Sequence, residues 1–169
     1  MPIPFSQAPT LSLPPASAAT GSGFTPSNPD YENRVRDSFA RQGAMRLLGA
    51  RLTEVRPGYC VIELPYRLDL TQQHGYVHAG IVSAIADSAG GYAGFSLFPA
   101  DASVLTVEYK LNLLAPAGGE RLIAQAEVVK AGRTLAITRG EVYAETGSKR
   151  TLCAIMQQTL IVLTGKQDA

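Results

Sequence analysis

The chain has 169 residues and a formal net charge of +1, with 15 Lys and Arg against 14 Asp and Glu. This length fits one domain with a sizeable core, and the balanced charge without a basic stripe argues against a protein that binds nucleic acid through its phosphates. The apolar runs are shorter than the roughly 18 residues that a membrane-spanning helix needs, so no membrane partner is expected.

The two cysteines, Cys60 and Cys153, lie in strand-like runs without metal-ligand spacing. We therefore expect a reduced, cytoplasmic chain with two core thiols, in preference to a disulfide.

Residues 1–29 differ in composition from the rest of the chain. They carry no charged side chain and are rich in Pro, Ser, Ala and Thr. They lack the cationic start of a secretory signal and the arginines of a transit peptide, and their prolines remove backbone donors. We expect an irregular N-terminal arm over 1–29, either loose or lying along a neighbouring subunit, and a single domain over 30–169.

The domain is predicted to begin with a helix and a hairpin. Ser27 or Asn28 suits the N-cap and Pro29 the first helical position. The helix is expected to end around 42–43, or one turn later at Gly49. Strand-like runs at 50–57 and 59–66 follow, and the Pro-Gly pair between them predicts a tight turn.

A long helix is predicted over residues 79–97, about 27 Å at 1.5 Å per residue. Its single carboxylate, Asp87, is surrounded on one face by small residues, namely Gly80, Ser83, Gly90, Gly91 and Gly94. A glycine inside a helix costs about 1 kcal/mol relative to alanine. We therefore infer that another backbone or a ligand comes close to this face. The structural alternative is a small-residue helix crossing in which Asp87 pairs with an arginine.

The rest of the chain reads as four strands. In 104–114, a row from Leu105 through Val107 and Tyr109 alternates with a polar row that starts at Thr106. Two strands, 121–130 and 133–145, join at a tight turn, and a slip of apolar parity at Gly140 predicts a bulge. A buried strand over 151–163 closes the chain. The order of elements predicts an α+β fold, one antiparallel sheet with one long helix against it.

Three features of the sequence belong together: the stretch Q-x-x-G-x-x-H-A-G at 72–80, the acid nine residues after its histidine, and the later TVEYKLNLLAPA. Together they resemble the PaaI-like hotdog-fold acyl-CoA thioesterases. That family shows N-x-x-G-x-x-H-G-G, then a helical acid, then T/S-V-x-x-x-x-N-x-x-x-P-A. The resemblance covers residues 38–163. Gln72 stands where Asn is usual and Ala79 replaces the first glycine of the pair, so we expect a reshaped site mouth. The residues that match in register are Gly75, His78, Gly80, Asp87, Thr106, Asn112 and Pro116.

The resemblance implies a hotdog fold, a sheet wrapped around the long central helix, and a thioesterase site shared by two subunits. The helix N-terminus at Ala79 and Gly80 offers free backbone N–H groups for an oxyanion. Asp87 lies too far along the same helix to act on a carbonyl bound there. In such enzymes the acid instead faces the oxyanion site of a second subunit. Gln72, His78 and the Ala79 N–H of one chain would thus meet Asp87 and Thr106 of another.

Within that site, Asp87 is expected to act as general base on water or as nucleophile, and both roles stay open. The Thr106 hydroxyl would hold the water, and His78 would orient the loop or the thioester. His74 is interpreted as a loop residue. Two histidines without a third ligand fall short of a zinc site, so neither a metal nor another cofactor is expected.

The predicted substrate-binding residues are Gly75, Lys130 and Arg133. Lys130 and Arg133 flank a hairpin turn and would contact the phosphates of CoA. A solvated hairpin tip is the alternative.

The sequence thus predicts a homodimeric or homotetrameric acyl-CoA thioesterase for a small-to-medium acyl or aryl group. A non-catalytic acyl-CoA-binding hotdog protein is the main alternative, and the intact Asp87 argues against it. A hotdog dehydratase would need a histidine in a different loop context, and a purely structural module would not explain the costly glycine face.

Overall fold

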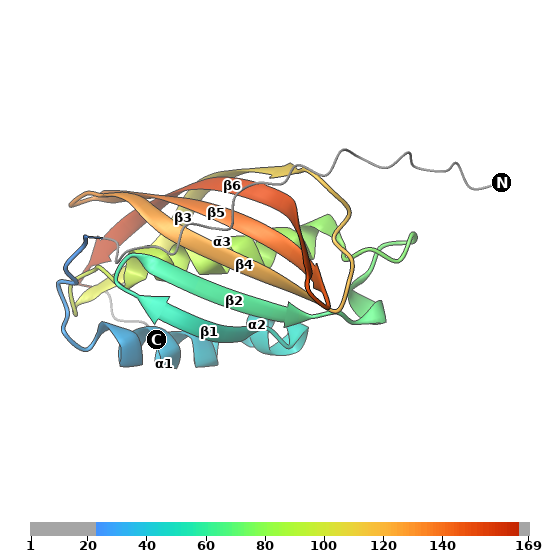
Figure 1. Cartoon of the computed structure of the whole chain (residues 1–169). Helices are drawn as coiled ribbons and strands as arrows, with labels where there is room; N and C mark the ends of the chain where they lie inside the picture. Colours follow the sequence, from blue (N-terminus) through green and yellow to red (C-terminus); the bar gives the residue numbers. More distant parts are fainter. Residues whose placement is uncertain (1–22, 166–169) are drawn as a thin grey trace.

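The computed structural model describes residues 23–165 (Figure 1). Residues 1–22 of the predicted arm lie outside this range. The helices are α1 (Tyr31–Arg41), α2 (Gly43–Leu48) and α3 (Ala79–Phe95), with a 3-10 turn η1 (Leu68–Leu70). The strands are β1 (Arg51–Arg56), β2 (Tyr59–Pro65), β3 (Ala102–Leu113), β4 (Arg121–Ala131), β5 (Leu135–Thr146) and β6 (Lys149–Thr164).

The described strands form one six-stranded sheet in the order β1-β2-β4-β5-β6-β3, with antiparallel neighbours throughout. Helix α3 packs against β2, β3, β4, β5 and β6, so the sheet curves around it (Figure 1). Helix α1 lies beside β1. The predicted α+β architecture is confirmed.

The first helix starts later than predicted. Its N-cap is Asp30, because the Asn28 side chain accepts the Asp30 N–H at 3.0 Å and the Asn28 carbonyl accepts the Tyr31 N–H at 3.2 Å. This local turn uses up the residues that were expected to form the first helical turn. The end at Gly49 is as expected: φ is +75° there, the left-handed conformation in which glycine ends a helix.

The last residues of the predicted arm already belong to the packed domain. Phe24 packs against the core, and the Ser27 N–H donates to the Leu97 carbonyl at 3.2 Å. Both predicted core thiols, Cys60 and Cys153, are buried and free, as expected.

The face of the sheet toward α3 is built from alternating residues, and in β5 this row is unbroken. Ala136, Thr138, Gly140, Val142 and Ala144 are all buried, and Gly140 pairs in register with both neighbouring strands. The predicted bulge at Gly140 is therefore wrong. The inward row carries small and polar residues at its centre. Because the prediction took apolar residues to mark the inward row, it assigned the wrong residues of β5 to the inner face.

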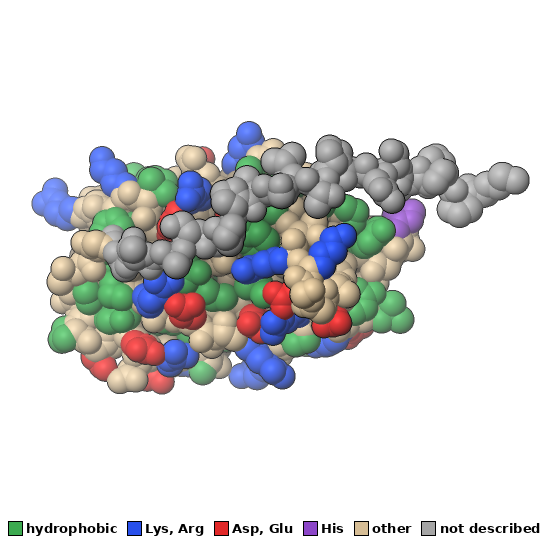
Figure 2. Space-filling view, viewed as in Figure 1, with side chains coloured by type: hydrophobic (Ala, Val, Ile, Leu, Met, Phe, Trp, Pro, Cys, Tyr) green, Lys and Arg blue, Asp and Glu red, His purple; other side chains and the backbone are tan. Residues whose placement is uncertain are grey.

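The opposite face of the sheet carries charged side chains of both signs, interspersed over the strands in the view of Figure 2. Cross-strand ion pairs join Arg139 to Glu127 at 2.6 Å and Arg121 to Glu63 at 3.2 Å. This mixed surface agrees with the balanced charge of the sequence.

Candidate active site

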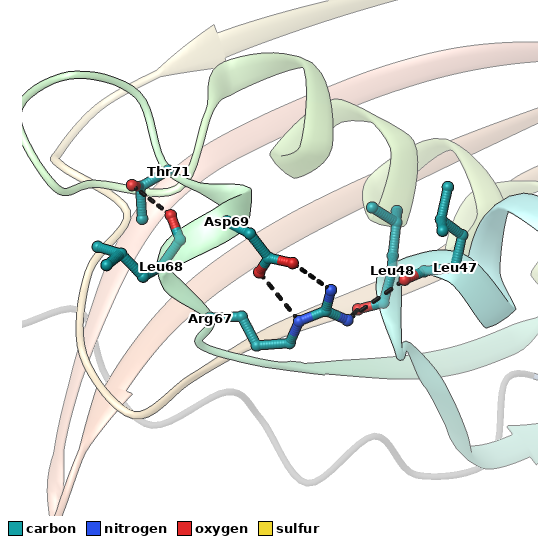
Figure 3. A network of polar contacts seen from close by, with 6 residues as sticks. All are labelled: Leu47, Leu48, Arg67, Leu68, Asp69 and Thr71. Carbon is teal, nitrogen blue, oxygen red and sulfur yellow. Dashed lines mark hydrogen bonds and ion pairs between the residues drawn. The ribbon is translucent and has the colours of Figure 1, made fainter.

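The loop that leads into α3 is anchored at its base by Arg67. Its guanidinium donates to both carboxylate oxygens of Asp69, at 3.1 and 2.6 Å, and to the carbonyls of Leu47 and Leu48 at the end of α2, both at 3.2 Å (Figure 3). These hydrogen bonds hold the pKa of Asp69 below its usual value, and the carboxylate raises the pKa of Arg67. Helix α2 thus fixes the 3-10 turn from which the loop starts.

The loop itself needs Gly75. The residue has φ of +80°, which other residues rarely adopt, and its N–H donates to the Gln72 carbonyl at 3.0 Å. The Tyr66 hydroxyl donates to the Gly75 carbonyl at 2.9 Å. The Gln72 side-chain oxygen accepts from the His74 N–H, whereas its amide nitrogen has no hydrogen-bond partner in the described chain. Gln72 therefore shapes the turn with one end of its amide, and the other end has no partner among residues 23–165.

His78 is the N-cap of α3. Its Nδ1 accepts the Gly80 N–H at 3.0 Å, and its carbonyl accepts from Ile81 and Val82 at 2.9 and 3.1 Å. The Ala79 N–H is then the first-turn donor left without a partner among residues 23–165. Because Nδ1 accepts the Gly80 N–H, a neutral His78 ring carries its proton on Nε2, which is then a donor. Gly80, expected to supply a free N–H, uses it in the cap.

Asp87 is held by polar side chains from two strands. Thr106 Oγ1 of β3 donates to Asp87 Oδ1 at 2.7 Å, and Gln158 Nε2 of β6 donates to the same oxygen at 2.6 Å. Gln158 is 1% exposed, and its Oε1 accepts from the Thr138 hydroxyl of β5 at 2.8 Å. Asp87 forms no ion pair within the described residues, so the alternative of an arginine partner is not what the structure shows.

The glycines around Asp87 face different neighbours. A Cβ at Gly90 would overlap Gln158 Oε1, and one at Gly94 would overlap Leu160 Cδ1. A Cβ at Gly91 would meet nothing within 4 Å. The close approach inferred from the sequence is therefore made, at Gly90 and Gly94, by side chains of the chain's own β6. Gly91 faces open space.

That open space is part of a cavity of about 610 Å³ between α1, α3 and β3. The sequence did not indicate that helix α1 would line this cavity, because its cavity-lining residues lie far from Asp87 along the chain. Tyr92 of α3 lines the cavity, whereas Phe95 is buried in the core. The lining residues are Ser38, Arg41, Gln42, Asp87, Ser88, Gly91, Tyr92, Ser103, Val104, Leu105 and Thr106.

Strand β3 departs from the predicted alternation. Its pairing with β6 shifts between Thr106 and Glu108, so that Val107 forms a bulge. Thr106 and Tyr109 consequently both point toward α3, where the Ser83 hydroxyl donates to the Tyr109 hydroxyl at 2.6 Å. The prediction that Tyr109 shares a row with Val107, opposite Thr106, is wrong.

Lys130 and Arg133 lie at the exposed β4–β5 hairpin, as predicted. The loop before α3 lies at the other end of β4, because the Val77 N–H donates to the Ala117 carbonyl just before that strand begins. Lys130 is about 30 Å farther along β4 at roughly 3.3 Å per residue. Within one chain, the structure does not bring these cations together with His78.

Residues 23–165 contain no group of three His, Cys, Asp or Glu side chains that could hold a metal ion. Among the described helices, none has the length and apolarity needed to cross a membrane.

Comparisons with known proteins agree with this architecture. Residues 74–151 match the model of the thioesterase superfamily. A protein of Halobacterium salinarum, classed provisionally as an esterase, is 35% identical over 100 residues, which are 56% of this chain and 66% of that protein. The 1,4-dihydroxy-2-naphthoyl-CoA hydrolase of Listeria monocytogenes is 24% identical over 111 residues, 66% of this chain and 89% of the hydrolase.

Solved structures extend the likeness to the whole domain. A thioesterase family protein from Silicibacter pomeroyi is 52% identical, with a TM-score of 0.79, over 80% of this chain and 99% of its own. The Escherichia coli PaaI protein from the phenylacetic acid degradation operon shares the fold alone, at 17% identity and a TM-score of 0.73 over 81% and 96% of the two chains. The chain therefore belongs to the thioesterase superfamily, a family of thioester hydrolases with the hotdog fold.

Proposed function

We propose that the chain hydrolyses acyl-CoA thioesters and that the carboxylate of Asp87 is its catalytic group. The observation that carries the proposal is a carboxylate in the wall of a cavity of about 610 Å³, oriented through one oxygen by Thr106 and Gln158. Such a group can take a proton from water or attack a carbonyl. The Listeria relative, a CoA thioester hydrolase by name, supports this substrate class.

Two routes lead to the same products. With Asp87 as base, a water oxygen attacks the thioester carbonyl while the carboxylate takes the water's proton, the C–S bond breaks, and the proton passes to the CoA thiolate. With Asp87 as nucleophile, a carboxylate oxygen displaces the thiolate, and water then hydrolyses the mixed anhydride. In both routes the carbonyl oxygen gains negative charge. The Ala79 N–H and the His78 Nε2–H would stabilise it, and loss of such a donor typically costs about 2.7–4 kcal/mol.

The site is proposed to be shared by two subunits. Ala79 and Asp87 are separated by about 12 Å along one helix at 1.5 Å per residue, whereas reacting atoms must approach to roughly 3–3.5 Å. Strand β3 is an edge of the sheet, and its apolar side chains Leu105 and Val107 are each 58% exposed. Exposed apolar edges favour pairing with another chain. We therefore propose a homodimer, alone or as half of a homotetramer, with no active monomer.

The cavity is proposed to hold the acyl group. Its volume lies within the range of roughly 300–1,000 Å³ that is usual for small-molecule sites. Its lining combines hydroxyl and amide groups, the charged Arg41 and Asp87, and the apolar side chains of Val104, Leu105 and Tyr92. A small-to-medium acyl or aryl group fits this description. Lys130 and Arg133 would then contact the phosphates of a CoA bound at a neighbouring subunit, since they lie far from the loop of their own chain.

A panel of acyl-CoA and aryl-CoA substrates, assayed with a thiol reagent, tests this function. We predict that Asp87→Asn lowers kcat by about 100-fold or more and leaves the fold intact, because the exchange is nearly isosteric but removes both base and nucleophile. Asp37→Asn, which alters an exposed carboxylate of α1 outside the cavity lining, serves as the control. Near-wild-type turnover by Asp87→Asn would refute the assigned mechanism, and acyl-CoA binding without thiol release by the wild type would indicate a non-catalytic sensor.

A further inference from the structure

We propose that Gln158 is a positioning residue that turns the Asp87 carboxylate so that Oδ2 is its reacting oxygen. The inference rests on the proposed function and goes beyond it, since it assigns a role to a residue of the last strand and distinguishes the two oxygens of one carboxylate.

The two carboxylate oxygens have different surroundings. Oδ1 accepts hydrogen bonds from Thr106 at 2.7 Å and from Gln158 at 2.6 Å. No described residue donates a hydrogen bond to Oδ2. Two donors on Oδ1 fix the plane of the carboxylate and engage that oxygen. Oδ2 is thereby left to receive a proton from water or to attack the thioester.

Gln158 can present only its NH₂ group to Asp87. Its Oε1 accepts from the Thr138 hydroxyl at 2.8 Å, and its Nε2 lies 3.0 Å from Thr106 Oγ1 and 3.1 Å from the Asp87 carbonyl oxygen. A reversed amide would place its oxygen against the carboxylate and against these other acceptors. The Thr138 side chain, which is 0% exposed, satisfies Oε1, and the two Asp87 acceptors keep the donor end of the amide toward the carboxylate.

Gly90 makes room for this arrangement. A side chain there would overlap Gln158 Oε1 and come within 2.8 Å of Thr138 Oγ1. Glycine is unfavourable inside a helix, so its presence beside the amide indicates that the position of Gln158 matters.

The chain offers a matched pair of variants. Gln158→Met keeps the length of the side chain and removes its donor. Gln157→Met makes the same exchange one residue earlier, on the exposed face of β6. We expect Gln158→Met to lower kcat by about 10- to 100-fold, the loss of one hydrogen bond to a charged group, while KM stays within about twofold. Gln157→Met should change neither of these.

Two further measurements separate positioning from mere core packing. Thr138→Val, which removes the hydrogen bond to Gln158 Oε1, should also lower kcat, but by less. In an Asp87→Asn background, Gln158→Met should cause no further loss, because the two residues act as one unit.

A folded Gln158→Met variant with wild-type kcat would overturn the inference and leave the proposed function standing. If Gln158→Met did not fold, wild-type kcat in Thr138→Val would overturn it equally. Full activity of Asp87→Asn would instead remove the proposed function, and this inference with it.

Discussion

At the residue scale, the glycines of α3 serve two purposes. Gly90 and Gly94 admit side chains of β6 into the surface of the helix, and Gly91 leaves the cavity open beside Asp87. Each glycine weakens the helix by about 1 kcal/mol relative to alanine. Packing against the sheet offsets this cost at Gly90 and Gly94. At Gly91 no packing contact offsets it, and the absence of a side chain keeps the cavity open.

Alanine substitutions should therefore act in opposite directions at adjacent positions. We predict that Gly90→Ala destabilises the fold by about 1–3 kcal/mol, because the new methyl group must displace Gln158 or Thr138. Gly91→Ala should stabilise it by up to about 1 kcal/mol, because nothing opposes the gain in helix propensity. Denaturant unfolding of both variants beside the wild type checks this. Equal destabilisation by the two variants would contradict the different roles assigned to Gly90 and Gly91.

The sequence was sufficient to single out Asp87, since one acid among small residues is unusual in a buried helix. The family resemblance placed Thr106 in the same half-site, but Gln158 was not predicted. Gln158 lies 71 positions away, and the pair Gln157-Gln158 reads as ordinary polar residues of a strand. Only the pairing of β6 with β3 and β5 shows that one glutamine faces solvent and the other faces the helix.

At the scale of elements, the strands and the long helix were predictable, but the inward row of two strands was not. In β3 the letters alternate regularly, yet the bulge at Val107 moves Tyr109 to the inner face. In β5 an apparent slip of parity is no bulge, because Thr138 and Gly140 occupy inward positions. Alternation of apolar residues reports the inward row only where that row packs on apolar neighbours, and both strands here face the polar surroundings of Asp87.

The loop before α3 depends on an element-level anchor, the Arg67–Asp69 pair on η1. Hydrogen bonds from Arg67 lower the pKa of Asp69, so the folded chain takes up this proton less readily than the unfolded chain. The pair thus stabilises the fold above the usual carboxyl pKa of about 3.9, and the contribution is lost as the pH falls through the lowered pKa of the folded state.

We predict that Asp69→Asn lowers the thermal midpoint slightly near neutral pH, and that this difference from the wild type shrinks as the pH falls below the usual carboxyl pKa of about 3.9. Differential scanning calorimetry over this range measures it. Asp37→Asn, at an exposed carboxylate with no ion pair in the described chain, should show no such trend. A difference that stayed constant with pH would show that the pair does not anchor η1 through its charge.

At the scale of the whole molecule, the order of elements was enough to predict one sheet around one helix, because each strand-like run found its place in a single antiparallel sheet. The open edge at β3 and the distance between Ala79 and Asp87 both support an active site that needs a second copy of the chain. The distance already follows from the helix predicted over 79–97, whereas the identity of the edge strand depends on the order of strands in the folded sheet.

In the proposed dimer, each active site takes its oxyanion donors from one chain and Asp87 from the other. Two inactive variants should then rescue each other: Asp87→Asn, and the double variant Gln72→Ala with His78→Ala. A mixed dimer has one site with every lesion and one site with none. Random reassembly of equal amounts gives about half heterodimer, so we predict recovery of roughly a quarter of wild-type activity. If subunit exchange were verified and no activity returned, both sets of residues would have to work within one chain, and the shared site would be refuted.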